Sequence, residues 1–90
     1  MRLQQIKDVL RANGVAIKDD NKDAFVSVRQ EDARGVQITS LYSYRTTSKV
    51  RSLLTAFAAL YQVRLVHGEV WGQGDGAEFF VQEIEKEVRA

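Results

Sequence analysis

The spacing of apolar residues changes several times along this chain, and each change predicts a helix or a strand. Two segments repeat apolar residues every three or four positions, as a helix with one buried face does. The first covers residues 3–10 and stops before Asn13-Gly14, a pair suited to the left-handed backbone that closes a helix. The second covers residues 50–61 and predicts the helix over the core; its apolar positions include Val50, Leu53, Leu54, Phe57 and Tyr61.

Strand-like runs of β-branched and alternating apolar residues predict four strands, over residues 15–18, 24–29, 36–45 and 63–70. The connectors between the first three are short and polar, which favours an antiparallel meander. After a glycine-rich loop, helical spacing returns and predicts a last helix over 77–88, with Ala77, Phe80, Val81, Ile84 and Val88 facing inward. We therefore expect one α+β domain over residues 1–90, in the order α-β-β-β-α-β-α. Its mainly antiparallel four-stranded sheet would carry the helices on one face.

Composition agrees with a small globular domain and excludes several classes of protein. The chain is 44% hydrophobic and 28% charged, which is ordinary for a folded domain. It has no cysteine, so disulfides, a thiol nucleophile and the usual structural zinc sites are excluded. No segment approaches the roughly 20 apolar residues that cross a bilayer, and the first residues lack the apolar core of a signal peptide. We expect a cytoplasmic protein with no membrane partner.

Three motifs have the residue types of a chemical site without its surroundings. Residues 72–77 match G-x-G-x-x-A, but no acidic residue follows about 20 positions later, and Asp75 is negative where phosphates would bind. Residues 19–23 begin like a calcium loop, but Ala24 and Gln30 replace its glycine and glutamate. His67, the only histidine, has no nucleophile or second ligand at a recognisable spacing. The sequence predicts no cofactor, no metal ion and no catalytic residue.

One segment runs against the rule that acidic residues favour the start of a helix. Residues 29–51 contain five basic and two acidic residues, a net charge of +3, and the basic residues crowd around the start of the core helix. With the hydroxyls and tyrosines among them, they resemble an anion site. The candidate contacts are Tyr42, Tyr44, Arg45, Ser48, Lys49 and Arg51. The plainer alternative is that Thr47 or Ser48 caps the helix, the tyrosines pack in the sheet and the cations are ordinary surface charge.

Charge is also distributed unevenly between the middle and the end of the chain. Residues 69–90 contain six acidic residues against two basic ones. Opposite patches on one small domain favour association with another protein or with a second copy. Trp71 and Phe79 are candidate aromatic contacts, although Trp71 would also serve to close the core. We expect a non-enzymatic interaction module that binds a protein partner or forms a homo-oligomer. The alternative is nucleic-acid binding through segment 42–51; a small hydrolase or nuclease is the least supported.

Overall fold

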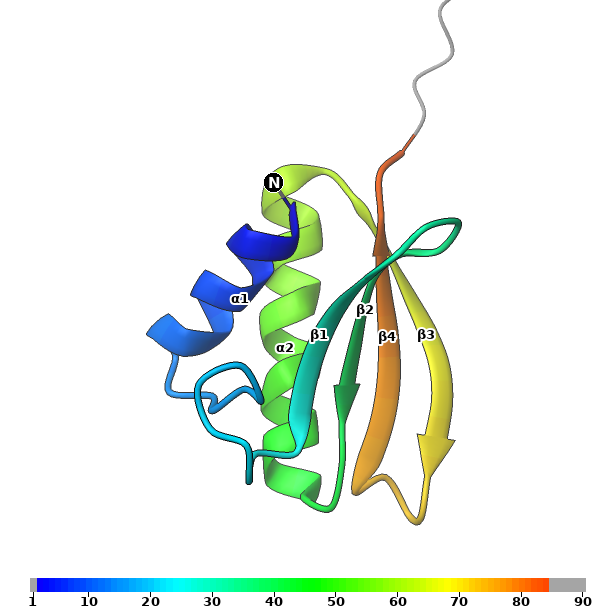
Figure 1. Ribbon diagram of the computed structural model, residues 1–90. Coiled ribbons are helices and arrows are strands. Elements are labelled where there is room, and N and C mark those ends of the chain that lie inside the picture. The colour runs from blue at the N-terminus through cyan, green and yellow to red at the C-terminus, as the bar shows by residue number, and fades with distance from the viewer. Residues whose placement is uncertain (1, 85–90) are drawn as a thin grey trace, which may run out of the picture.

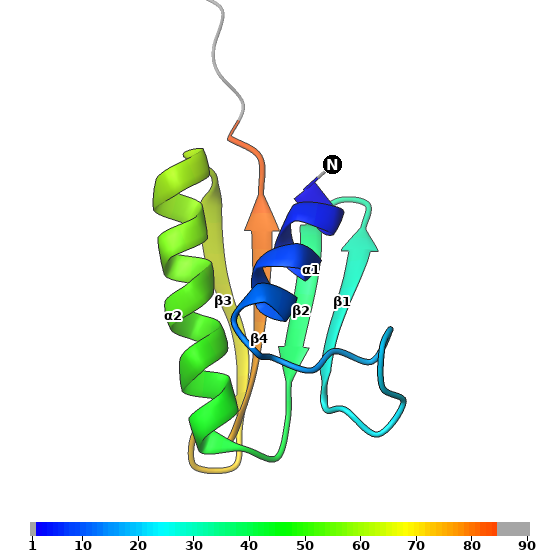
Figure 2. The same ribbon diagram turned by 90° about the vertical axis from the view of Figure 1, so that its left-hand side faces the viewer.

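A computed structural model describes residues 2–84 and gives the element order α-β-β-α-β-β. Helix α1 (Arg2–Ala12) precedes the hairpin of β1 (Val26–Glu31) and β2 (Gly35–Ser40). Helix α2 (Tyr44–Tyr61) precedes a second hairpin, of β3 (Arg64–Trp71) and β4 (Gly76–Gln82). The strands form one antiparallel sheet in the order β1-β2-β4-β3, and both helices lie on the same face of it (Figures 1 and 2). The predicted α+β class and antiparallel sheet are confirmed.

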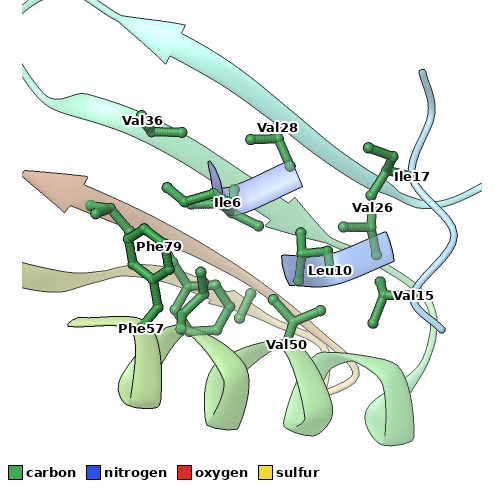
Figure 3. Close-up of a cluster of buried hydrophobic side chains, with 14 of the residues drawn as sticks. Ile6, Leu10, Val15, Ile17, Val26, Val28, Val36, Val50, Phe57 and Phe79 are labelled. Carbon is green, nitrogen blue, oxygen red and sulfur yellow. The ribbon is translucent and has the colours of Figure 1, made fainter. Parts of the chain in front are cut away.

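The core lies between the helices and the face of the sheet that they cover. Alternate residues of each strand point to this face, as the pleat of a strand requires. Helix α1 lies over β1, while α2 lies mainly over β4 and β3 (Figure 2). Figure 3 shows how these side chains meet. The buried members of the core include Ile6, Leu10, Val28, Ile38, Leu54, Phe57 and Phe79. Within residues 2–84, neither helix has the length and apolarity needed to cross a membrane.

Helix α2 begins six residues before its apolar repeat and is capped by Ser43. The Ser43 backbone is extended (φ −152°), and its hydroxyl accepts a hydrogen bond from the Thr46 N–H at 3.1 Å. A cap by Thr47 or Ser48 is therefore wrong. The preceding strand is shorter than predicted, because Tyr42 adopts a left-handed backbone (φ 61°) that an extended strand cannot contain.

Residues 15–18 are not a strand, although their apolar residues are buried as a strand would bury them. Val15 and Ile17 reach the core. Only the Lys18 N–H extends toward β1, where it donates to the Val26 carbonyl. The chain then turns, because the N–H groups of Asp20 and Asn21 both donate to the Ile17 carbonyl. Burial alone thus produced the alternation that suggested a strand.

Residues 77–82 belong to strand β4, so the predicted last helix is wrong over these positions. Strand β4 is central in the sheet and buries a phenylalanine on each of its two faces. Phe79 points to the helices, and Phe80 lies on the other face, with the Arg34 guanidinium 4.6 Å from its ring centre. A strand buried on both faces has an unbroken apolar run, which does not distinguish it from a buried helix. Residues 83 and 84 are not helical either, and Ile84, predicted to face inward, is 49% exposed. The last part of the predicted helix, residues 85–88, lies outside the described residues.

Candidate anion-binding site

A pocket of about 330 Å³ lies where the first two turns of α2 face the loop between α1 and β1. Its floor is apolar, since Val15, Ala24 and Val26 are buried. Its helix side is polar and positive, with Ser43 and Thr46 beside two cations. The residues that line it are Gly14, Val15, Ala16, Ala24, Phe25, Val26, Leu41, Ser43, Arg45, Thr46 and Lys49.

Arg45 and Lys49 provide the positive charge of this pocket. They are four residues apart on α2, so their side chains leave the same face of the helix. Both are exposed, and within residues 2–84 neither forms an ion pair. Helix α2 contains no acidic residue at all. The charge on this wall is therefore not neutralised by the described part of the chain.

The Lys49 ammonium lies over the loop on the far side of the pocket. A Cβ built at Gly14 would lie 3.8 Å from Lys49 Nζ. Gly14 has φ +78°, the left-handed backbone predicted for it at the end of α1. Because Gly14 has no side chain, it leaves room for the end of the Lys49 side chain.

Phe25 lines the pocket, and the ring of Tyr42 packs against it. Phe25 and Tyr42 meet edge to face with ring centres 5.0 Å apart, and their side chains are 51% and 72% exposed. Phe25 was not among the candidates from the sequence. A signal for it existed, because the inward alternation of Ala24 and Val26 assigns the residue between them to the outer side.

The loop that forms one wall is tied to α1 by ion pairs. Lys7 Nζ lies 2.6 Å from a carboxylate oxygen of Asp19, and Arg11 Nε lies 2.7 Å from one of Asp20. The hydrogen bond from Arg11 lowers the pKa of Asp20 below its ordinary value, and the charge of Arg11 acts in the same direction. Two of the carboxylates that suggested a calcium loop, Asp19 and Asp20, are thus paired with cations of α1.

The helix wall is fixed by buried hydroxyl groups. Ser40 Oγ and Thr47 Oγ1 share a hydrogen bond of 2.9 Å, and Thr47 donates to the Asp75 carbonyl at 3.1 Å. The Ser43 N–H donates to the same carbonyl at 2.9 Å. The start of α2 is therefore held to both β2 and the turn between β3 and β4.

The structure divides the six candidate contacts between two sides of α2. Arg45 and Lys49 line the pocket, and Tyr42 contacts Phe25, which also lines it. Tyr44 faces the turn between β3 and β4, where a Cβ built at Gly74 would lie 3.4 Å from its ring. Ser48, one turn after Tyr44, is exposed on that side. Arg51 also turns away from the pocket, with its guanidinium 5.8 Å from the centre of the Phe79 ring.

The two candidate protein-contact aromatics have different surroundings. Phe79 is 1% exposed in the core, so its prediction as a surface contact is wrong; it followed from treating β4 as a helix. His67, the histidine of the neighbouring strand, lies edge-on to it at 5.6 Å. Trp71 is half-buried and packs on Gly76, where a built Cβ would lie 3.4 Å from the indole.

The glycine-rich loop joins two antiparallel strands. Trp71 pairs with Gly76, and Gly72 and Gly74 in the turn between them have positive φ. A dinucleotide site instead needs a helix directly after the loop, so that its N-terminus can face the pyrophosphate. Within residues 2–84, no three His, Asp or Glu side chains are grouped as metal ligands would be.

A second, apolar groove of about 230 Å³ lies between α1 and the C-terminal half of α2. Leu60 stands on its rim and is 74% exposed. The lining residues are Val9, Asn13, Leu53, Ala56, Phe57, Leu60 and Tyr61.

Comparison with models of protein families, with curated proteins and with solved structures finds no match for this chain.

Proposed function

We propose that this protein is a non-enzymatic interaction module that binds an anionic group of its partner in the pocket beside the first two turns of α2. The observation that carries the proposal is the pairing of Arg45 and Lys49 on one pocket wall, without an acidic partner among the described residues. No chemical step belongs to the proposal, and the cytoplasmic location expected from the sequence is proposed with it.

The positions of these cations support an anionic ligand. A positive side chain near the N-terminus of a helix opposes the helix dipole and costs about 0.3–1 kcal/mol. An anion in the pocket would offset that cost, because it interacts favourably with both cations and with the positive end of the helix dipole. The guanidinium of Arg45 offers paired donors for a phosphate, sulfate or carboxylate, and the ammonium of Lys49 adds a point charge. The cap by Ser43 fixes the first turn of α2 in the position where such a group would bind.

Binding of heparin, a polyanion without bases, tests this function. Binding is measured over a range of salt concentrations for the wild type, for Arg45→Gln/Lys49→Gln, and for the control Arg29→Gln/Arg64→Gln. The control removes the same charge from exposed residues of β1 and β3. We expect the pocket variant to weaken binding and to reduce the salt dependence by about two released counterions. The control should stay close to the wild type; equal losses in both variants would contradict the proposal.

We propose self-association through the C-terminal half of α2 as a second candidate function. Residues 52–62 carry no charge, so two copies of this surface can approach without like-charge repulsion. In a two-fold pair, the exposed Leu60 of each copy would fill the apolar groove of the other. The expected occupant is therefore a second copy of this chain.

Light scattering over a range of protein concentrations tests the second candidate. We expect a dimer for the wild type and a monomer for Leu60→Glu, which places a charge in the apolar contact. Ser48→Glu adds the same charge to an exposed site on the other half of α2 and should remain dimeric. A wild type that is monomeric at every concentration would exclude this function.

A further inference from the structure

We propose that the anionic partner is single-stranded nucleic acid, whose phosphates bind Arg45 and Lys49 while its bases stack on the exposed rings around them. This inference rests on the proposed function, because it names the ligand of the same pocket. It specifies the chemical class of the ligand, which the positive charge of the pocket alone does not.

Three large aromatic side chains are exposed around the start of α2. Phe25, Tyr42 and Tyr44 are 51%, 72% and 67% exposed, while the other phenylalanines lie in the core or beneath Arg34. A ring left in water loses the favourable transfer that its burial would give. Bases stack on such rings with little sequence preference, because every base has an aromatic face. Exposed rings beside cations are the combination that sequence-tolerant single-strand binding uses.

The rings lie on both sides of the helix start. Tyr42 contacts Phe25, which directly precedes edge strand β1. Tyr44 instead covers Gly74, in the turn that follows the opposite edge strand β3. The Ser43 cap and the cationic wall of the pocket lie between the Phe25–Tyr42 pair and Tyr44. A chain of nucleotides can place bases on both sides and phosphates between them, whereas a single nucleotide fits one side only.

The same observations disfavour duplex nucleic acid and acidic peptides. In a duplex the bases are already stacked on one another, so the three rings would have no partner. The net charge of +1 and two pocket cations are also a small basic surface for a duplex backbone. An acidic peptide would satisfy Arg45 and Lys49 but would leave the exposed rings unexplained. Stacking on a ring and phosphate contacts do not involve the 2′-hydroxyl, so we expect both DNA and RNA to bind.

Fluorescence anisotropy with oligothymidylate and oligouridylate of about ten nucleotides tests the inference. A DNA duplex of equal length, heparin and polyglutamate complete the panel. We expect both single strands to bind at least about fivefold more tightly than the duplex, the effect of one stacked base. For the pocket variant Arg45→Gln/Lys49→Gln, the salt slope should fall by about 1.4, as expected when two phosphate contacts to a single strand are lost.

Substitution of the rings separates stacking from charge. Phe25→Leu and Tyr44→Leu keep an apolar side chain but remove the ring, and each should weaken single-strand binding about fivefold or more. Phe25→Tyr keeps a ring and should bind like the wild type. Tyr61→Leu removes an aromatic ring at the other end of α2 and serves as the control. Thermal unfolding of each variant shows that the fold is retained.

The outcomes distinguish this inference from the function on which it rests. If heparin binds through the pocket but single strands bind no better than the duplex or polyglutamate, the ligand assignment is wrong and the anion pocket stands. Unchanged binding in both Phe25→Leu and Tyr44→Leu would also overturn the assignment. If no polyanion binds in a salt-dependent way, both the assignment and the proposed function are wrong.

Discussion

The rings of Phe25 and Tyr42 meet edge to face with 5.0 Å between their centres, although more than half of each side chain remains exposed. The pair joins the start of β1 to the loop that leads into α2, and it forms one edge of the pocket. Tyr42 also adopts φ 61°, a backbone conformation that residues with a Cβ seldom adopt. A large ring is thus held in an unfavourable backbone conformation at the surface, which is common at functional sites.

This conformation predicts an inverted order of stability at position 42. Tyr42→Ala and Tyr42→Gly both remove the ring contact, but only glycine adopts a positive φ without steric cost. We expect Tyr42→Gly to unfold at a higher urea concentration than Tyr42→Ala, with a difference of about 1 kcal/mol in the free energy of unfolding. If the alanine variant is the more stable, the left-handed backbone at this position is incorrect.

Packing of α2 on the sheet predicts unequal effects at two apolar positions of the same helix. Phe57 is 3% exposed and Leu60 is 74% exposed. Phe57→Ala should lower the free energy of unfolding by about 3–5 kcal/mol, because it leaves a cavity in the core. At a protein concentration low enough for the chain to be monomeric, Leu60→Ala should change it by less than about 0.5 kcal/mol. Chemical denaturation measures both, and similar losses would contradict the observed orientation of α2.

The buried hydroxyls of Ser40 and Thr47 predict energetic coupling between β2 and α2. Thr47→Val removes the partner of Ser40 Oγ and leaves a buried polar atom without a hydrogen bond, at a cost of about 1–3 kcal/mol. In Ser40→Ala/Thr47→Val both polar atoms are absent, so the double variant should lose less stability than the sum of the single ones. A double-mutant cycle by urea unfolding measures the difference, and simple additivity would show that the hydroxyls do not interact.

The ion pair of Arg11 and Asp20 predicts a pH-dependent effect on stability. The pKa of Asp20 is lowered from 3.8 by the hydrogen bond from Arg11, so the charged carboxylate stabilises the folded state. That stabilisation is present above the pKa of the unfolded chain and disappears as pH falls through the lower folded value. Asp20→Asn should therefore be less stable than the wild type at neutral pH, with a gap that closes in acid. A gap that stays constant between neutral pH and strong acid would exclude this pairing.

The sequence predicted the fold class because burial imposes a period on the residues that face the core. Val26 and Val28 alternate in β1, and Leu54 and Phe57 recur at helical spacing in α2. The same reasoning failed at β4. Phe79 and Phe80 are neighbours in the sequence and are buried on opposite faces of a central strand, so they interrupt the alternation of apolar and polar residues that marks a strand. It also failed at residues 15–18, where burial is not accompanied by a strand.

The candidate site was predictable in its charges but not in its complete membership. Arg45 and Lys49 stand out in the sequence, since cations seldom begin a helix. Phe25 is some twenty positions earlier, and only the packing of β1 beside α2 brings it to the same pocket. Arg51 is close to Lys49 in sequence, but the rotation of the helix turns it toward Phe79. The tertiary structure therefore determines which residues lie at the pocket, and the spacing of residues in the sequence does not.

The central claim is that the pocket beside the start of α2 binds anions. The most direct test is a titration with inorganic tripolyphosphate, followed by two-dimensional NMR of the backbone amides at low salt. We predict saturable shifts concentrated at Gly14, Phe25, Arg45 and Lys49, and their loss in Arg45→Gln/Lys49→Gln. Shifts that are absent, that are concentrated on the uncovered face of the sheet, or that persist unchanged in this variant would contradict the account.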